Sequence, residues 1–231
     1  MWSTKGTVRS GFWRQAIALT LLAVLANSAA AFAQEPGPDR WEPAMLAYEE
    51  ADRRSPPPKG SIVFLGSSSF RRWDLDRYFP GRGLINRGFG GSQMEDALRY
   101  LDRIVLPLEP RAVFLYEGDN DTGSGKSPET VAGQFRDLAA KIHAALPETR
   151  IVFVSIKPSL RRWHLIDVAR KANDLIREAC AESDLLQYVD AATPLLGADG
   201  QPRPDLFVED GLHLNDAGYR IWATVLEPYL D

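Results

Sequence analysis

The sequence predicts an α/β fold in which helices cover both faces of a parallel sheet of five strands. From residue 61 onward, short apolar runs alternate with longer amphipathic stretches, which is the pattern of strand–helix–strand units. Three of the runs are unbroken series of mostly Val, Ile, Phe and Leu. Such runs are typical of strands that are buried on both faces of a sheet.

The five expected strands lie at residues 61–66, 84–88, 112–118, 150–156 and 187–191. Ser92, with Glu95 three residues later, has the pattern of a capping box and is expected to begin a helix. Ser127 followed by Pro128 is expected to begin another, because proline is favoured at the first helical position. Two more helices are expected over residues 167–181 and 215–229.

The chain before the first strand is expected to lie outside the main domain. Residues 1–33 have the pattern of a signal peptide, with a basic start, an uncharged stretch and the cleavage signal Ala31-Phe32-Ala33. An uncleaved N-terminal membrane anchor is the alternative. Residues 34–59 are expected to form an N-terminal segment with a Pro-rich linker, and residues 60–231 the domain. Within that segment a short helix is expected over residues 41–54, with Trp41, Met45 and Tyr48 on one side. The protein is therefore expected to be periplasmic or secreted, without stable membrane association once the peptide is removed.

Composition narrows the class of partner. The chain carries 27 basic and 31 acidic residues, a net charge of −4, and removal of residues 1–33 makes the charge more negative. This balance argues against nucleic acid or an anionic membrane surface as a partner. The single cysteine, Cys180, excludes a disulfide within the chain, and its helical spacing from Ala172 and Ile176 predicts a core position.

Hydroxyl, amide, carboxylate and imidazole groups follow the strands of the expected sheet. Ser67-Ser68-Ser69 follows the first strand, Gly88–Ser92 the second and Gly118–Asp121 the third, while Asp210–His213 precedes the last helix. In open α/β sheets the active site lies beyond the carboxyl ends of the strands. A serine near an imidazole that a carboxylate orients, with N–H donors close by, is the set of groups that acyl transfer requires.

Four sequence blocks stand in a fixed order along the chain: FLGSSSF, NRGFGGS, YEGDND and DGLH. With them the chain resembles the SGNH hydrolases, also called the GDSL lipase and esterase family, from Ser61 to the C-terminus. The resemblance implies a flavodoxin-like α/β/α sandwich of three layers. It also implies an enzyme that uses neither a metal nor another cofactor.

The resemblance also implies a role for particular residues. Ser68 is the expected nucleophile, His213 its base and Asp210 the partner of that base. Gly91 and Asn120, together with the backbone N–H of Ser68, are the expected oxyanion donors.

Two positions depart from the family pattern. Ser67 stands where the family has Asp, which makes the geometry of the first loop less certain. Asp119 stands where Thr is common, and a carboxylate near an oxyanion site is unfavourable unless it points away or is paired.

Other site types fit the sequence less well. The run from Gly88 to Gly91 is not a dinucleotide-binding loop, because Gln93 occupies the position of the third glycine. Glu117, Asp119 and Asp121 alternate like calcium ligands, but Thr122 stands where the calcium loop requires glycine.

The expected activity is hydrolysis of carboxylic esters, with short acyl groups such as O-acetyl on carbohydrates preferred because no long lid insertion is present. Trp73 and Trp163 are expected to stack on sugar rings, and Arg162 to meet an anionic substrate, whereas Arg71 and Arg72 are interpreted as solvated charges. Three alternatives remain: a lipase, lysophospholipase or thioesterase acting on longer acyl chains, an O-acyltransferase with the same residues, and a non-catalytic binding domain.

Overall fold

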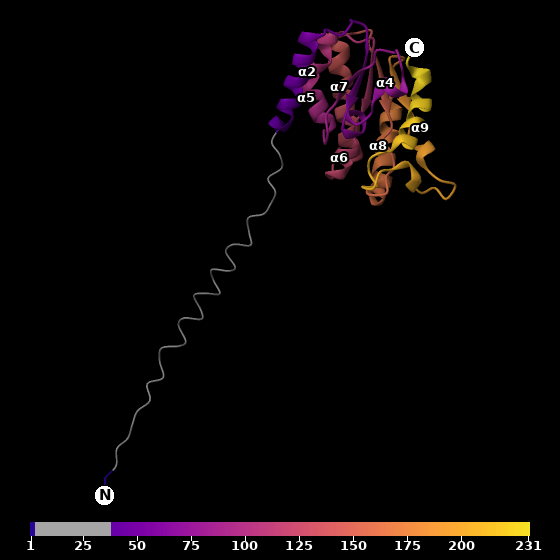
Figure 1. The fold of residues 1–231 in the computed structure, drawn as a ribbon. Helices are drawn as coiled ribbons and strands as arrows, with labels where there is room; N and C mark the ends of the chain where they lie inside the picture. Colours follow the sequence, from indigo (N-terminus) through magenta and orange to yellow (C-terminus); the bar gives the residue numbers. More distant parts are fainter. Residues whose placement is uncertain (3–37) are drawn as a thin grey trace. The chain divides into compact units, whose positions relative to one another are not determined.

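A parallel sheet of five strands forms the middle layer of the protein (Figure 1). The structure is a computed structural model that describes residues 1–2 and 38–231. The strands lie in the order β2-β1-β3-β4-β5. Their bounds are β1 Ile62–Gly66, β2 Ile85–Gly88, β3 Ala112–Tyr116, β4 Arg150–Val154 and β5 Leu186–Val189. The five strands expected from the sequence are confirmed, each slightly shorter than predicted.

Helices cover both faces of the sheet, which confirms the three-layer architecture. One face carries α2 (Glu42–Arg54), α5 (Met94–Ile104), α7 (Pro128–Ala145) and α8 (Ile166–Cys180). The other carries α3 (Ser68–Arg71), α4 (Leu75–Tyr78) and α9 (Asp216–Leu226). The short helix α6 (Asp119–Gly123) follows β3. Single 3-10 turns lie at Pro38–Trp41, Leu106–Leu108, Trp163–Leu165, Thr193–Leu195, Pro204–Leu206 and Glu227–Tyr229.

Alternate side chains of each strand enter two separate cores. Val63 and Leu65 of β1 lie in the core beneath α5 and α7, whereas Phe64 lies in the core beneath α3 and α9. Because successive side chains of a strand point to opposite faces, a strand between two helical layers must be apolar throughout. Phe64 stacks on Phe114 of the neighbouring strand at 4.6 Å between ring centroids.

The helix starts agree with the sequence in one case and differ in another. Ser127 caps α7 as expected, since its hydroxyl accepts a hydrogen bond from the Thr130 N–H. At α5, however, the capping box is Gln93 with Asp96, and the prediction of Ser92 with Glu95 is wrong by one residue. The Ser92 hydroxyl is not available for capping because it donates to the buried Glu117 carboxyl group, at 2.5 Å.

Helix α2 belongs to the main body of the fold, which spans Trp41–Asp231. The indole of Trp41 donates to the Gly90 carbonyl at 3.0 Å, and the Tyr48 hydroxyl donates to the Gly88 carbonyl at 2.6 Å. The body therefore begins before residue 60, and it includes the helix that the sequence analysis placed in the N-terminal segment. Residues 1–33, read as a signal peptide, lie almost entirely outside the described residues.

Two further features of the described chain bear on the sequence analysis. Cys180 is buried in the core as predicted, and burial raises the pKa of its thiol to about 12. Among the residues that the structure describes, no helix is both long enough and apolar enough to cross a membrane.

Candidate active site

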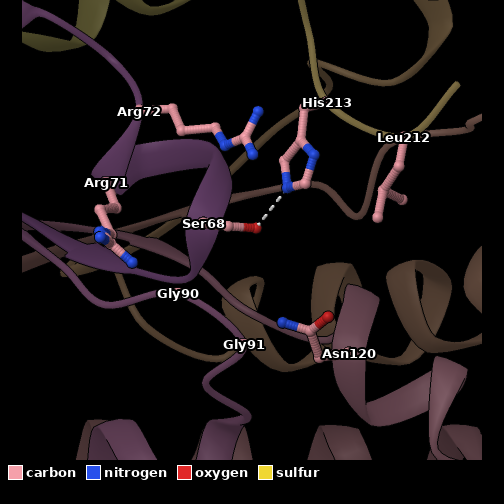
Figure 2. A pocket seen from close by; sticks show the side chains of 8 residues that line it. All are labelled: Ser68, Arg71, Arg72, Gly90, Gly91, Asn120, Leu212 and His213. Atoms are coloured by element: carbon pink, nitrogen blue, oxygen red, sulfur yellow. Dashed lines mark hydrogen bonds between the residues drawn. The ribbon is translucent and has the colours of Figure 1, made fainter. Parts of the chain in front are cut away.

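The first three strands of the sheet end at the same level, which brings their loops together. Gly66, the last residue of β1, pairs with Gly88 of β2 and with Tyr116 of β3. The chain then continues to Ser68 after β1, Gly91 after β2 and Asn120 after β3. All three residues line one pocket (Figure 2).

Helix α3 carries Ser68 and packs closely on β2. A Cβ atom on Gly88 would lie 2.3 Å from the backbone nitrogen of Arg71, so only glycine allows this approach. The Ser69 carbonyl accepts a hydrogen bond from the Tyr219 hydroxyl of α9 at 2.7 Å. The Phe70 carbonyl accepts another from the Asn86 side chain, also at 2.7 Å. These contacts fix the position of the short helix and of the Ser68 side chain.

Ser68, His213 and Asp210 form a continuous hydrogen-bonded chain. The Ser68 Oγ lies 2.8 Å from the His213 Nε2, and the His213 Nδ1 lies 2.6 Å from the Asp210 Oδ2 (Figure 2 shows the first of these bonds). Since an ionised carboxylate only accepts hydrogen bonds, the Nδ1 carries the proton and the Nε2 is left to accept the serine proton. This is the arrangement that a serine nucleophile requires.

Asp210 is held in place by the turn that it begins. Its Oδ1 accepts the backbone N–H groups of Leu212 and His213, each at 2.9 Å. Partial burial acts to raise the pKa of Asp210, but the hydrogen bonds from the side chain and backbone of His213 outweigh it and hold the pKa well below its usual value. The carboxylate is therefore charged throughout the neutral range and can stabilise a protonated His213.

Hydrogen-bond donors lie on the side of Ser68 that is away from His213 (Figure 2). As the first residue of α3, Ser68 has an N–H that the bonds within the helix do not use. Gly91 also lines the pocket and has a positive φ of 80°, a conformation that glycine adopts most readily. The Asn120 Nδ2 donates one hydrogen to the Ser92 carbonyl at 2.9 Å, which leaves its second hydrogen for a ligand.

The pocket has a volume of about 430 Å³, and most of the residues that line it have polar or charged side chains. Leu212 contributes an apolar side chain, and two arginines, Arg71 and Arg72, extend into the pocket from α3 (Figure 2). Both arginines are exposed, which agrees with their interpretation as solvated charges, but the sequence analysis did not place them at the pocket. Their spacing gave a signal, because residues three and four positions after Ser68 lie on the same face of a helix as Ser68.

Two of the three expected substrate-binding residues lie elsewhere. The ring of Trp73 is only 2% exposed and packs against Tyr219 at 5.4 Å between centroids, so the prediction that it stacks on a sugar is wrong. Trp163 is half-buried and is not among the residues that line the pocket. Its ring instead lies 5.6 Å beneath the Arg170 guanidinium.

The third, Arg162, contacts other site residues. Its guanidinium donates to the Asp119 carboxylate at 2.6 Å and to the Asn120 Oδ1 at 3.1 Å. Arg162 is not among the residues that line the pocket, and its side-chain hydrogen bonds go to the loop after β3. The bond to Oδ1 turns the Asn120 nitrogen toward Gly91 (Figure 2).

The family model of GDSL-like lipases and acylhydrolases matches residues 60–221 of the chain. The chain belongs to this family. A comparison with curated proteins found no match.

Several solved structures share the fold. A Streptococcus pneumoniae protein described as a platelet activating factor superposes with a TM-score of 0.76 at 22% identity, over 94% of this chain and 99% of that one. A GDSL-like lipase from Bacteroides thetaiotaomicron gives 0.68 at 21% identity, over 80% and 96%. An acetylxylan esterase from Geobacillus stearothermophilus gives 0.61 at 15% identity, over 75% and 95%.

The unusual Asp119 of this family member is fully paired. Its carboxylate accepts from the buried Lys157 Nζ at 3.0 Å as well as from Arg162. Burial acts to raise the pKa of Asp119, but the charges of Lys157 and Arg162 outweigh it and keep the pKa below its usual value. The negative charge is thus neutralised by two cations and does not oppose an oxyanion. The sequence showed Asp119 but not its partners, which follow a different strand.

The other carboxylates that alternate with Asp119 serve the fold. Asp121 accepts hydrogen bonds from the backbone N–H groups of Met94 and Gly118. Glu117 is buried and accepts from Ser92. In the part of the chain that the structure describes, no three side chains of the metal-binding types come together as a candidate metal site.

Proposed function

We propose that the protein hydrolyses carboxylic esters through a covalent acyl-enzyme on Ser68, and that short acyl groups such as O-acetyl are preferred. The observation that carries this proposal is the hydrogen-bonded chain from Ser68 through His213 to Asp210. It lies in a pocket that Gly91 and Asn120 also line.

In the first half of the reaction, the Ser68 oxygen attacks the ester carbonyl while the His213 Nε2 takes its proton. The carbonyl oxygen becomes an oxyanion, which the N–H groups of Ser68, Gly91 and Asn120 stabilise. Asp210 stabilises the imidazolium that forms. When the tetrahedral intermediate collapses, His213 gives the proton to the departing alcohol oxygen, and the acyl group remains on Ser68.

In the second half, water repeats the attack on the acyl-enzyme. His213 takes a proton from the water, and the oxygen adds to the acyl carbonyl. Collapse of the second intermediate returns that proton to the Ser68 oxygen and releases the carboxylic acid. Both halves balance with the ester, one water molecule and the side chains of the protein.

The lining of the pocket supports a short acyl group. A long acyl chain needs a continuous apolar surface, since each buried methylene contributes about 0.8 kcal/mol. Among the residues lining this pocket, Leu212 is the one large apolar side chain, and the others are polar, charged or glycine. One protein of this fold, the Geobacillus stearothermophilus acetylxylan esterase, is named for an acetylated carbohydrate.

A series of p-nitrophenyl esters of increasing acyl length, run beside acetylated polysaccharides, tests this proposal. We expect the highest kcat/KM with acetate and a steep loss beyond a few carbons. An organophosphonate should label Ser68, while the neighbouring Ser67 and Ser69, each 2% exposed, provide internal controls. Ser68→Ala should abolish both labelling and hydrolysis. Hydrolysis that survives Ser68→Ala, or a preference for long chains, would contradict the proposal.

We also propose that the protein is exported and that residues 1–33 are removed. The basic, uncharged and small-residue parts of that segment support this, in their order along the chain. Mass spectrometry of the protein recovered from its producing cells should show an N-terminus at Gln34. A full-length chain that fractionates with membranes would favour the uncleaved anchor instead.

A further inference from the structure

Arg71 and Arg72 are the charged side chains of the pocket that the proposed reaction does not use. They stand at the end of α3, three and four residues after Ser68, and both line the pocket. A Cβ atom on Gly90 would lie 3.0 Å from the Arg71 Nη1, so this guanidinium lies beside the glycine loop. Figure 2 shows the Arg72 side chain extending on the side of His213.

Neither guanidinium has a protein partner within residues 38–231. No hydrogen bond or ion pair joins either of them to a carboxylate or a carbonyl of that part of the chain. Other arginines near the sheet behave differently: Arg87 pairs with Asp52, Arg103 with Glu42 and Glu49, and Arg162 with Asp119. The pocket is thus lined by the guanidinium groups of two consecutive residues that no carboxylate of the described chain pairs with.

The pocket is cationic in a chain that is acidic overall. The net charge of the chain is −4, yet no carboxylate side chain is among the residues that line the pocket. A pocket of one sign attracts ligands of the other and raises their local concentration. Arginine also presents a planar set of donors that matches the oxygens of carboxylates and phosphates. The chemistry of the lining therefore fits an anion.

The proposed reaction decides which part of the substrate carries the anion. His213 returns its proton to the oxygen of the leaving alcohol, so the alcohol part lies next to the imidazole. Arg72 extends on that same side of Ser68. We propose that Arg71 and Arg72 form a subsite for a carboxylate or phosphate group on the alcohol part of the ester. This inference rests on the proposed esterase function and specifies its substrate class.

Matched pairs of acetate esters test the subsite. The carboxylate pair is meta-acetoxybenzoate and the neutral meta-acetoxybenzamide, and the phosphate pair is acetylglycerol phosphate and acetylglycerol. The readout is the ratio of kcat/KM for the anionic ester to that for its neutral partner. We expect a ratio above one for at least one pair, and the pair with the larger ratio identifies the preferred anion. Added salt should lower kcat/KM for the anionic esters far more than for the neutral ones.

Arginine variants show whether the preference comes from these side chains. Arg71→Gln and Arg72→Gln should each lower the ratio about tenfold, the usual effect of losing one charge-assisted contact, and the double variant should bring it near one. Arg54→Gln is the matched control, because Arg54 is an exposed arginine at the end of α2, away from the pocket lining. It should leave the ratio unchanged. Circular dichroism and thermal unfolding check that each variant is folded.

The possible failures are distinct. Ratios of one or less in both pairs, or ratios that the arginine variants leave unchanged, would overturn the subsite while hydrolysis of the neutral esters still supports the esterase. No hydrolysis of any ester, p-nitrophenyl acetate included, would overturn the proposed function and this inference with it.

Discussion

Asn120 lies between two hydrogen bonds that decide which of its side-chain atoms faces the pocket. Arg162 donates to its oxygen, and its nitrogen donates to the Ser92 carbonyl. Reversal of the amide would place two donors together on one side and two acceptors on the other. Arg162 therefore holds the amide in the orientation that can donate to an oxyanion, and the buried Asp119 in turn holds Arg162.

We expect Asn120→Ala to lower kcat by about 10²–10³, the usual loss for one oxyanion donor. Arg162→Gln should lower kcat by a smaller factor with little change in KM, because it releases the Asn120 amide without removing it. In the Asn120→Ala background, Arg162→Gln should have almost no further effect on kcat, since residues that act through one another are not additive.

Arg161→Gln is the control for this cycle, because Arg161 is an exposed neighbour of Arg162. Steady-state kinetics of the two single variants, the double variant and the control give the result. Full additivity of the Asn120 and Arg162 effects would mean that Arg162 acts independently of Asn120.

At the residue scale, the sequence motifs located the groups of the site but not their surroundings. Ser68, His213 and Asp210 stand in short blocks whose local spacing is informative. The burial of Trp73 depends on Tyr219 and Trp222, which arrive from α9. The pairing of Arg162 likewise depends on a loop that follows a different strand. Contacts between residues so far apart in the sequence leave no local pattern to read.

At the scale of elements, α2 shows how a helix predicted correctly can be given the wrong place. Its spacing of Trp41, Met45 and Tyr48 indicated an apolar side but not what that side covers. In the structure, Met45 is buried against the sheet side of the fold, and Arg103 of α5 pairs with Glu42 and Glu49 of α2. The Pro-rich segment after it is a connection within the body rather than a boundary.

Two adjacent residues test the contribution of α2 to stability. Met45 is 0% exposed and Leu46 is 52% exposed. Met45→Ala should lower the free energy of unfolding by about 2–5 kcal/mol, because it leaves a cavity in the core. Leu46→Ala should change it by no more than about 0.5 kcal/mol. Urea denaturation of both variants measures the difference. Equal small effects would mean that α2 is docked too weakly to belong to the folded body.

At the scale of the whole molecule, the sheet determines where the site lies, and it also buries an ionisable side chain. The alternation of strands and helices was enough to predict the parallel sheet and the edge at which the loops meet. It did not predict that β3 would be the central strand, nor that Glu117, which directly follows β3, would be buried. The hydrogen bond that Glu117 accepts from Ser92 joins the loops after β2 and β3. These are the loops that carry Gly91 and Asn120.

Glu117 is expected to make the stability of the protein depend on pH. Burial, followed by the nearby charge of Asp121, raises the pKa of Glu117 well above its ordinary value of 4.5. The folded protein therefore keeps Glu117 protonated at pH values where the unfolded chain has lost that proton. Rising pH favours the state that binds fewer protons, so the contribution of Glu117 to stability falls as pH rises from 4.5 toward its raised pKa.

Glu117→Gln removes this titration and leaves a neutral side chain of similar shape. The free energy of unfolding of the variant relative to the parent protein should rise with pH, by at most about 1.4 kcal/mol per pH unit within that window. Below pH 4.5 both proteins carry a neutral group at residue 117, so the difference measured there gives the packing effect of the substitution alone. Urea denaturation across the acid and neutral range measures both quantities. A difference that stays constant with pH, or that falls as pH rises, would show that Glu117 is ionised in the folded protein and that its link between the loops is a charged one.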